Sequence, residues 1–299
     1  MKPFLKWVGG KTQILDEVLE EFPKEINNYY EPFLGGGSVL LGVLSSKKIK
    51  IQGTIYASDV NEKTIALFKN IQKNLPEFLL ELKKLVEKYN SIELMNEKKE
   101  KRKVNNKPTL EESTETKENY YYFIRRLYNS LEDKTQVQAS AMLLFLNKTC
   151  FRGVYREGPN GFNVPFGHNK NVGIYDEDHL KEVSKLIEKV EFSCCSFEKA
   201  LESMKEKDFV YLDPPYAPEN STSFVGYVED GFSLDKHNQL FKLVKEKTYF
   251  VMSNSDVKLV KDSFPSPTYK TKIISARRAI NSKNPESKTN EVLISRILY

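Results

Sequence analysis

Cysteine, histidine and tryptophan are scarce in this chain of 299 residues, which contains three, three and one of them, respectively. Cys194 and Cys195 are adjacent and poorly placed to bridge each other, so we expect reduced thiols in an intracellular protein rather than a disulfide framework. The histidines His168, His179 and His237 share no metal-ligand spacing with one another or with cysteine. We therefore predict no metal site, and we expect all three histidines at the surface or in loops.

Long apolar runs and a targeting pattern are also missing. No run approaches the ~20 residues that span a bilayer, and the first residues lack the charged, apolar and small-residue zones of a signal peptide. We therefore expect no membrane segment. Hydrophobic residues make up 39% of the chain and charged residues 29%, which is typical of a globular protein with one or two domains. The net charge of +5 permits a polyanionic partner without requiring one.

The opening stretch KWVGGKTQIL contains the trio Gly10-Lys11-Thr12, which resembles the end of a nucleotide-binding P-loop. A P-loop also needs a glycine five residues before its Gly-Lys pair, so that backbone N–H groups can surround the phosphates. That position is Leu5, which argues against an ATP site. The trio must serve another purpose. Apolar residues recur at helical spacing after it and predict a helix over residues 11–22.

Strand and helix patterns alternate at both ends of the chain but not in its middle. Residues 61–89 and 120–146 have helical patterns, and residues 147–173, rich in glycine, asparagine and aromatics, predict an ordered loop region. Strands are predicted at residues 29–33, 53–57, 190–192, 209–212, 249–252, 272–275 and 291–297.

This arrangement predicts an α/β fold in which both ends of the chain build one Rossmann-like mixed sheet. A mostly helical insertion interrupts that sheet domain. We assign residues 1–72 and 174–299 to the sheet domain and residues 73–173 to the insertion.

A glycine-rich loop, Glu31-Pro32-Phe33-Leu34-Gly35-Gly36-Gly37, follows the first predicted strand. Its glycines allow a ligand to approach the backbone closely. Leu40 occupies the place of the third glycine of a dinucleotide fingerprint, which disfavours a pyrophosphate cofactor. Asp59 follows the next strand, 24 residues after Gly35, near the spacing at which an acidic residue binds ribose hydroxyls. The loop therefore suits a nucleoside without a diphosphate.

The tetrapeptide Asp213-Pro214-Pro215-Tyr216 directly follows the apolar strand predicted at 209–212. Two successive prolines stiffen the backbone and remove two donors, which leaves a carbonyl and a carboxylate to accept hydrogen bonds. Acceptors without donors suit an amino group. If Asp213 and the Pro214 carbonyl accept the two hydrogens of an exocyclic amino group, its nitrogen can pyramidalise and attack. Tyr216 offers a face on which a base can stack.

Asp-Pro-Pro-Tyr is the signature of amino-group methyltransferases that use S-adenosylmethionine. Together with Lys6-Trp7-Val8-Gly9-Gly10-Lys11 and the glycine loop, in this order, it resembles the Dam-like DNA adenine-N6 methyltransferases of the D12 class, α group. Phe162-Asn163-Val164-Pro165-Phe166-Gly167 is similar to a further segment of that family's DNA-reading domain. The resemblance covers nearly the whole chain except the polar stretch around residues 98–117.

The resemblance implies a site-specific enzyme that transfers a methyl group from S-adenosylmethionine to N6 of an adenine flipped out of duplex DNA. Its catalytic residues would be Asp213, Pro214 and Tyr216. Ser196 stands where the family usually has an acidic residue before the phenylalanine, which puts that contact to the cofactor adenine in doubt. Trp7 and Phe197 remain open to interpretation as core residues. The cofactor pocket would contain Trp7, Gly9, Gly10, Lys11, Glu31, Phe33, Gly35, Gly37, Asp59, Phe197 and Asp213.

DNA recognition is expected from the insertion, chiefly from residues 151–156 and 162–167. Arg156 aligns with the family's base-reading arginine, and Phe151 falls where related enzymes place an aromatic wedge; phosphate contact is the alternative for the arginines. GATC is the leading target, although Arg152 and His168 depart from the family pattern in this segment. The predicted DNA-binding residues are Phe151, Arg152, Arg156, Pro165, and, in a polar loop before the last strand, Arg277 and Arg278.

Two other functions remain open at this point. A methyltransferase of an RNA base or of protein glutamine would use the same acceptor site, because a planar amide or another base amine fits it. A non-catalytic DNA-binding relative is the second alternative. We expect a protein that acts on double-stranded DNA as a monomer or weak dimer, with no metal and no membrane partner.

Overall fold

The computed structural model describes residues 1–92, 105–169, 172–217, 232–246, 249–277 and 288–296, without the side chains of residues 276, 277, 288 and 289. The chain forms two compact units. The first contains residues 1–2, 11–60 and 189–299, and the second contains residues 3–10 and 61–188. The boundaries that we predicted from the sequence, 72 and 174, both fall within the second unit.

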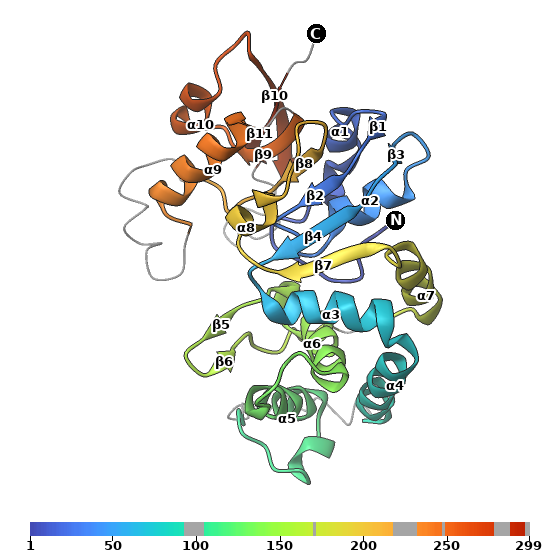
Figure 1. Cartoon of the computed structure of the whole chain (residues 1–299). Helices are drawn as coiled ribbons and strands as arrows, with labels where there is room; N and C mark the ends of the chain where they lie inside the picture. The colour runs from blue at the N-terminus through green and yellow to red at the C-terminus, as the bar shows by residue number, and fades with distance from the viewer. Residues whose placement is uncertain (93–104, 170–171, 218–231, 247–248, 278–287, 297–299) are drawn as a thin grey trace. The chain divides into compact units, whose positions relative to one another are not determined.

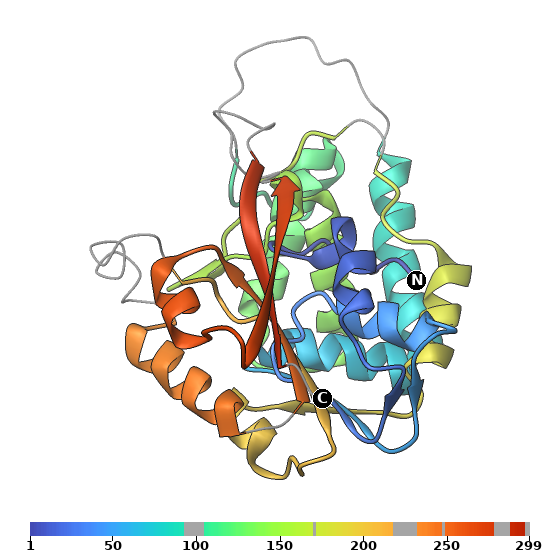
Figure 2. The same ribbon diagram turned by 90° about the horizontal axis from the view of Figure 1, so that it is seen from above.

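A seven-stranded mixed sheet forms the centre of the first unit (Figure 1). Its strands are β2 (Tyr29–Glu31), β4 (Ile55–Asp59), β7 (Val190–Cys194), β8 (Phe209–Leu212), β9 (Tyr249–Ser255), β10 (Tyr269–Arg277) and β11 (Lys288–Arg296). They lie in the order β10-β11-β9-β8-β2-β4-β7. The five strands from β9 to β7 are parallel, whereas β11 runs antiparallel to both β9 and β10. Figure 2 shows β10 and β11 as a long twisted pair, in red.

Strands β2, β4 and β8 position the loops that contain the predicted site residues. All four residues of β8 are buried, which explains their unbroken apolar run, since a central parallel strand is covered on both faces. Because β2 pairs in parallel with both β4 and β8, the carboxyl ends of the three strands meet at one edge of the sheet. Glu31 and Asp59 are the last residues of β2 and β4, and Asp213 directly follows β8.

Short helices complete the first unit. The predicted helix over 11–22 is wrong in extent, because Ile14 has a non-helical backbone that separates a 3-10 turn from the helix proper. A small parallel pair joins β1 (Glu25–Ile26) to β3 (Lys50–Ile51). The helical elements are η1 (Lys11–Gln13), α1 (Leu15–Glu20), α2 (Ser38–Ser45), α8 (Phe197–Glu202), α9 (Leu234–Glu246) and α10 (Lys258–Ser263).

The second unit is mostly helical, as predicted for the middle of the chain. Its helices are α3 (Glu62–Lys73), α4 (Leu75–Ser91), α5 (Lys117–Ser130), α6 (Val137–Thr149) and α7 (Glu177–Leu186), with a 3-10 turn η2 (Glu112–Thr114). Helix α6 is buried on nearly all sides and packs against α3, α4 and α5, which makes it the central helix of this unit. In the described part of the chain, no helix combines the length and apolarity needed to cross a membrane.

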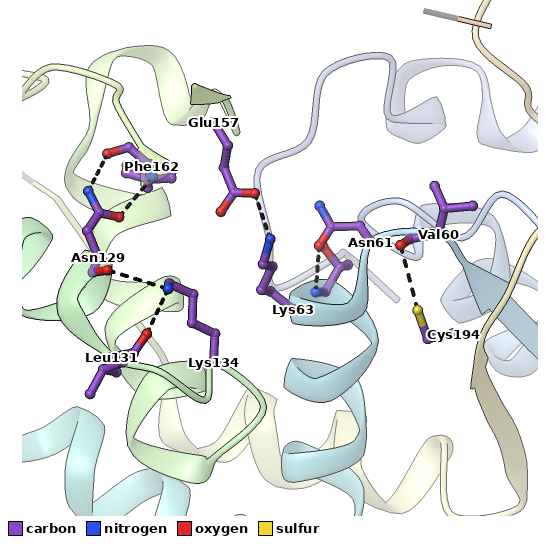
Figure 3. A network of polar contacts seen from close by, with 10 residues as sticks. Val60, Asn61, Lys63, Asn129, Leu131, Lys134, Glu157, Phe162 and Cys194 are labelled. Atoms are coloured by element: carbon purple, nitrogen blue, oxygen red, sulfur yellow. Dashed lines mark hydrogen bonds and ion pairs between the residues drawn. The ribbon is translucent and has the colours of Figure 1, made fainter. Parts of the chain in front are cut away.

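The predicted loop region 147–173 contains the end of α6 and three short regular elements. A 3-10 turn η3 (Phe151–Gly153) follows α6, and β5 (Glu157–Gly158) pairs antiparallel with β6 (Gly161–Phe162). The amide of Asn129 fastens this hairpin to α5, because its Nδ2 donates to the Phe162 carbonyl at 2.9 Å and its Oδ1 accepts from the Phe162 N–H at 2.9 Å (Figure 3). Lys63 and Glu157 form an ion pair of 2.8 Å in the same unit.

Candidate active site

The glycine loop after β2 is joined to the end of β4 by two hydrogen bonds. The Leu34 N–H donates to the Ser58 carbonyl at 3.0 Å, and the Gly35 N–H donates to Asp59 Oδ2 at 2.9 Å. Gly37 then closes a turn onto the Leu34 carbonyl at 2.9 Å and precedes α2. Gly35 and Gly37 have φ angles of 49° and 70°, which other residues rarely adopt. The loop and the Asp59 carboxylate, brought together by these bonds, suit a ribose.

A buried lysine, Lys11, forms an ion pair with the half-buried Asp213 in the first unit. Lys11 Nζ lies 2.7 Å from Asp213 Oδ2, and the two side chains are 3% and 20% exposed. The Lys11 N–H also donates to Ser38 Oγ at 3.0 Å, which fixes the start of η1 against α2. Burial raises the pKa of Asp213, Lys11 lowers it through its charge and hydrogen bond, and Glu291 raises it. The lysine therefore favours the anionic, proton-accepting form of Asp213.

Tyr216 is held by a residue that the sequence interpretation missed. Its hydroxyl donates to Glu291 Oε2 at 2.7 Å, from β11 at the far end of the chain. Lys11 Nζ lies over the Tyr216 ring, 5.0 Å from its centroid. Glu291 thus fixes one end of the tyrosine while Lys11 links its ring to Asp213.

The end of the tetrapeptide is fastened by two further buried side chains. The Ala217 N–H donates to Asn254 Oδ1 at 3.0 Å, and His237 Nε2 lies 3.1 Å from the Pro215 carbonyl oxygen. Both side chains are 0% exposed. The prediction that every histidine lies at the surface or in a loop is therefore wrong for His237, which belongs to α9.

The position of His237 has a physical reason that was visible in the sequence. It falls on the apolar stripe of α9 with Leu240, Phe241 and Val244, at spacings of three, four and seven residues. Burial lowers the pKa of His237, which favours the neutral ring. A neutral imidazole donates from one nitrogen only, so it can donate either to Pro215 or to the Ser233 carbonyl, 3.0 Å from Nδ1.

Glu31 is a nearly fully buried carboxyl group, with 2% of its surface exposed. It accepts a hydrogen bond of 2.6 Å from the Tyr29 hydroxyl. Burial raises the pKa of Glu31 to about 8, hydrogen bonds from Tyr29 and Leu40 oppose the shift, and Asp213 adds to it. At neutral pH the carboxyl therefore carries a proton for most of the time.

We expect Glu31→Gln to change how stability depends on pH. Between about pH 4.5 and 8 the folded wild type keeps the Glu31 proton that the unfolded chain loses, so its free energy of unfolding falls as the pH rises. The slope is roughly 1.4 kcal/mol per pH unit, and it levels off above the folded pKa. Glu31→Gln lacks this titration and should become the more stable protein at pH 8. Urea unfolding at pH 5, 7 and 9 measures the difference.

The exposed Glu25 provides a matched control for that experiment. Glu25→Gln makes the same chemical change on β1 and should follow the wild-type curve. Parallel curves for Glu31→Gln and the wild type would show that Glu31 is ionised in the folded protein.

Three aromatic rings gather beside the glycine loop in the first unit. Phe33 stacks on Phe197 with ring centroids 5.6 Å apart, and Phe232 contacts both rings at 5.8 and 5.5 Å. Phe197 is buried in the core, whereas Phe33 is half-buried. Ser196 introduces no carboxylate here, and Glu198, two residues later, is ion-paired with Lys236.

Residues 3–10, directly before Lys11, belong to the second unit. Trp7 stacks on Tyr155 with ring centroids 5.3 Å apart, and a turn through Gly9 closes with a 3.2 Å bond from the Gly10 N–H to the Trp7 carbonyl. Trp7 is half-buried, so it is not a simple core residue of this unit.

The two predicted DNA-reading segments lie side by side in the second unit. The Phe151 N–H donates to the Pro165 carbonyl at 2.8 Å, and the Gly167 N–H donates to the Thr149 carbonyl at 2.9 Å. Phe151 is 47% exposed, and the guanidinium of Arg152 lies over its ring at 5.2 Å. Phe162, Val164 and Phe166 point into the core, which leaves Asn163 and Pro165 exposed.

Arg156 is exposed and braced across the β5–β6 hairpin. Its Nε donates to Asn163 Oδ1 at 2.6 Å, and its Nη2 donates to the Asn163 carbonyl at 3.3 Å.

The prediction of a loop around Arg277 is wrong, because this residue ends β10. Arg278 lies outside the described residues. Among those that the structure describes, no group of three or more His, Cys, Asp or Glu side chains could hold a metal ion.

A seven-stranded mixed sheet in this order, with one antiparallel strand, is the fold of class I methyltransferases. The family model for D12 class N6 adenine-specific DNA methyltransferases matches residues 7–280, and the chain belongs to this family.

Relatives of known activity match almost the whole chain. The type II methyltransferase M.MjaIII of Methanocaldococcus jannaschii is 36% identical, with 96% of each chain covered. The DNA adenine methylase of Haemophilus influenzae is 29% identical over 96% of this chain and 90% of its own length. The DNA adenine methylase of Escherichia coli is 27% identical over 98% of this chain and 94% of its own.

Proposed function

We propose that this protein transfers a methyl group from S-adenosylmethionine to N6 of an adenine that it has flipped out of duplex DNA. The observation that carries the proposal is the half-buried Asp213 carboxylate, paired with the buried Lys11 at 2.7 Å in a tetrapeptide whose two prolines supply no N–H donors. Such a group accepts hydrogen bonds from an amino substituent. Family membership supports adenine as the base.

The residues of the first unit fit the proposed cofactor. Asp59, which already accepts from Gly35, is a carboxylate that can accept from ribose hydroxyls as well. The half-buried Phe33 ring, backed by Phe197, offers an apolar face for an adenine. When bound, S-adenosylmethionine supplies an activated methyl group on a sulfonium. Trp7, Gly9 and Gly10 are proposed cofactor residues on the resemblance alone.

The chain's own residues would then orient the target amino group. Asp213 accepts one amino hydrogen and the Pro214 carbonyl accepts the other, which frees the nitrogen lone pair from the ring. Tyr216, fixed by Glu291, stacks against the base, worth roughly 1–3 kcal/mol. No covalent intermediate is required, because positioning supplies most of the rate. We assign catalysis to the sheet unit and DNA reading to the helical unit.

For the target sequence, GATC is our proposal. Phe151, Arg152, Arg156 and Pro165 are exposed on adjoining segments of the second unit, and we propose that they contact the DNA. Arg156 is the strongest candidate for reading a guanine, since its bonds to Asn163 orient the guanidinium without burying it.

We expect Arg156→Ala to remove about 1–3 kcal/mol of discrimination against the wrong base at one position of the site. Methylation rates on duplexes that differ from GATC at single positions measure this loss. Arg126→Ala, which removes an exposed arginine from α5, serves as the control and should keep the wild-type preference. A uniform weakening across all sequences would instead identify Arg156 as a phosphate contact.

The proposed function is tested by incubating the protein with methyl-labelled S-adenosylmethionine and unmethylated plasmid DNA. The DNA is then digested to nucleosides, and we expect labelled N6-methyladenine. Mapping the label to restriction fragments gives the target sequence. Cofactor binding without any methylated nucleoside would contradict DNA as the substrate and redirect the search to RNA and protein glutamine.

A further inference from the structure

A buried asparagine joins two segments of the second unit that are more than 140 residues apart in the sequence. Asn147 lies in the last turn of α6 and is 1% exposed. Its Oδ1 accepts from the Lys6 N–H at 2.9 Å, and its Nδ2 donates to the Lys6 carbonyl at 2.8 Å. The same Nδ2 donates to the Gly153 carbonyl at 3.1 Å. One amide thus holds the opening segment, residues 6–10, to the reading loop, residues 151–153.

The contact between these segments is tight. A Cβ atom at Gly153, whose φ is 66°, would lie 2.3 Å from Lys6 Cδ and 2.5 Å from Lys6 Cβ. Trp7, directly after Lys6, stacks on Tyr155, two residues after Gly153, with ring centroids 5.3 Å apart. A shift of the reading loop therefore forces a shift of the opening segment, because Gly153 and Lys6 are in close contact with no free space between them.

The reading loop contains one residue with a strained backbone conformation. Arg152 has a φ of 57°, a conformation that costs of order 1 kcal/mol or more for a residue other than glycine. It lies between Phe151, which is tied to Pro165, and Gly153, which is tied to Asn147. DNA that engages Phe151 or Arg152 thus acts on the backbone that Asn147 holds.

The opening segment leads directly to the catalytic pair. After the turn that joins Trp7 to Gly10, the next residue is Lys11, whose ammonium group contacts Asp213. Lys11, whose charge favours the anionic form of Asp213, therefore follows five positions after Lys6, whose backbone Asn147 holds.

We propose that Asn147 is a positioning residue through which DNA at the reading loop and cofactor at the opening segment raise each other's affinity. The inference rests on the proposed function, because it assigns DNA to one segment and S-adenosylmethionine to the other. By linkage, the factor by which DNA tightens cofactor binding equals the factor by which the cofactor tightens DNA binding. Coupling of this kind typically amounts to about 5- to 150-fold.

The test is calorimetric titration of S-adenosylmethionine into the protein, with and without a duplex that contains the target site and N6-methyladenine, so that no turnover occurs. For the wild type we expect DNA to lower the cofactor Kd by at least about fivefold. For Asn147→Ala we expect the ratio of the two Kd values to fall to within about twofold of one. A loss of fold alone would not give this result, since DNA that binds the folded form would stabilise it and increase the ratio.

Asn129→Ala is the matched control. Asn129 makes the same two-bond contact to a backbone, at Phe162, in the same unit, but it does not touch residues 6–10 (Figure 3). It should keep the wild-type ratio. If Asn147→Ala does not fold, Tyr155→Leu removes the stack on Trp7 and should reduce the ratio by a smaller factor.

The possible outcomes separate the two proposals. A wild type that methylates DNA but shows a ratio of one, or an Asn147→Ala or folded Tyr155→Leu variant with the full wild-type ratio, would overturn the coupling alone. A wild type that neither binds the cofactor nor methylates DNA would overturn the proposed function.

Discussion

Replacing Asp213 with asparagine should lower the single-turnover rate of methyl transfer by about 100- to 1,000-fold or more, the range seen when one key catalytic hydrogen bond is removed. Asparagine keeps the shape of the side chain, but its amide can present N–H donors where the adenine amino group needs an acceptor. It also leaves the buried Lys11 without its anionic partner. We expect the alanine variant to be at least as inactive and to remain folded.

The matched control for this variant is Asp208→Asn. Asp208 is another aspartate of the same unit, 0% exposed, and it accepts hydrogen bonds from Asn27 and Asn28. This change should lower the thermal unfolding temperature and leave the single-turnover rate of the folded enzyme intact. Retained turnover in Asp213→Asn would remove the carboxylate from the mechanism.

Replacing Lys11 with methionine should move the acid limb of the pH–rate profile to higher pH. Asp213 accepts hydrogen bonds best as the anion, and Lys11 supplies the two interactions that lower its pKa against the effect of burial. Without the lysine, burial and Glu291 raise that pKa further, so less of the enzyme is active at neutral pH. The rate should then increase about tenfold per pH unit until the new pKa is reached.

Single-turnover rates between pH 6 and 9.5 measure this shift. Lys63→Met is the control, because Lys63 forms an ion pair of similar length, 2.8 Å, with Glu157 in the other unit. Its profile should match that of the wild type. A loss in Lys11→Met that is equal at every pH would mean that the lysine binds a ligand and does not tune Asp213.

Features set by local pattern could be predicted from the sequence. The strand at 209–212 has the predicted bounds. An unbroken apolar run predicts a buried strand, and the following Asp-Pro-Pro ends it because prolines cannot donate to the sheet. The strand predicted at 53–57 begins two residues later, at Ile55. Gly53 belongs to the preceding turn, since its N–H donates to the Asn27 carbonyl at 2.8 Å and a Cβ there would lie 2.2 Å from Asn28 Oδ1.

The supporting side chains of the candidate site could not be predicted in the same way. Glu291, Asn254 and Asn147 act through contacts with residues 37 to 141 positions away, and no periodicity encodes such contacts. For Glu291 the sequence contained a partial indication, because this carboxylate directly precedes the apolar residues of β11 that are buried. The contact between Lys11 and Asp213 could likewise not be predicted, although each residue belonged to a motif.

The fastening of residues 213–217 has a consequence for conformational entropy. Two prolines fix the φ angles of positions 214 and 215, while His237 and Asn254 hold the Pro215 carbonyl and the Ala217 N–H. Ordering a free backbone costs roughly 1–2 kcal/mol per residue. Here the backbone loses this conformational entropy when the protein folds and not when the base binds. The incoming base therefore meets acceptors that are already in place, and its binding energy is left for flipping and alignment.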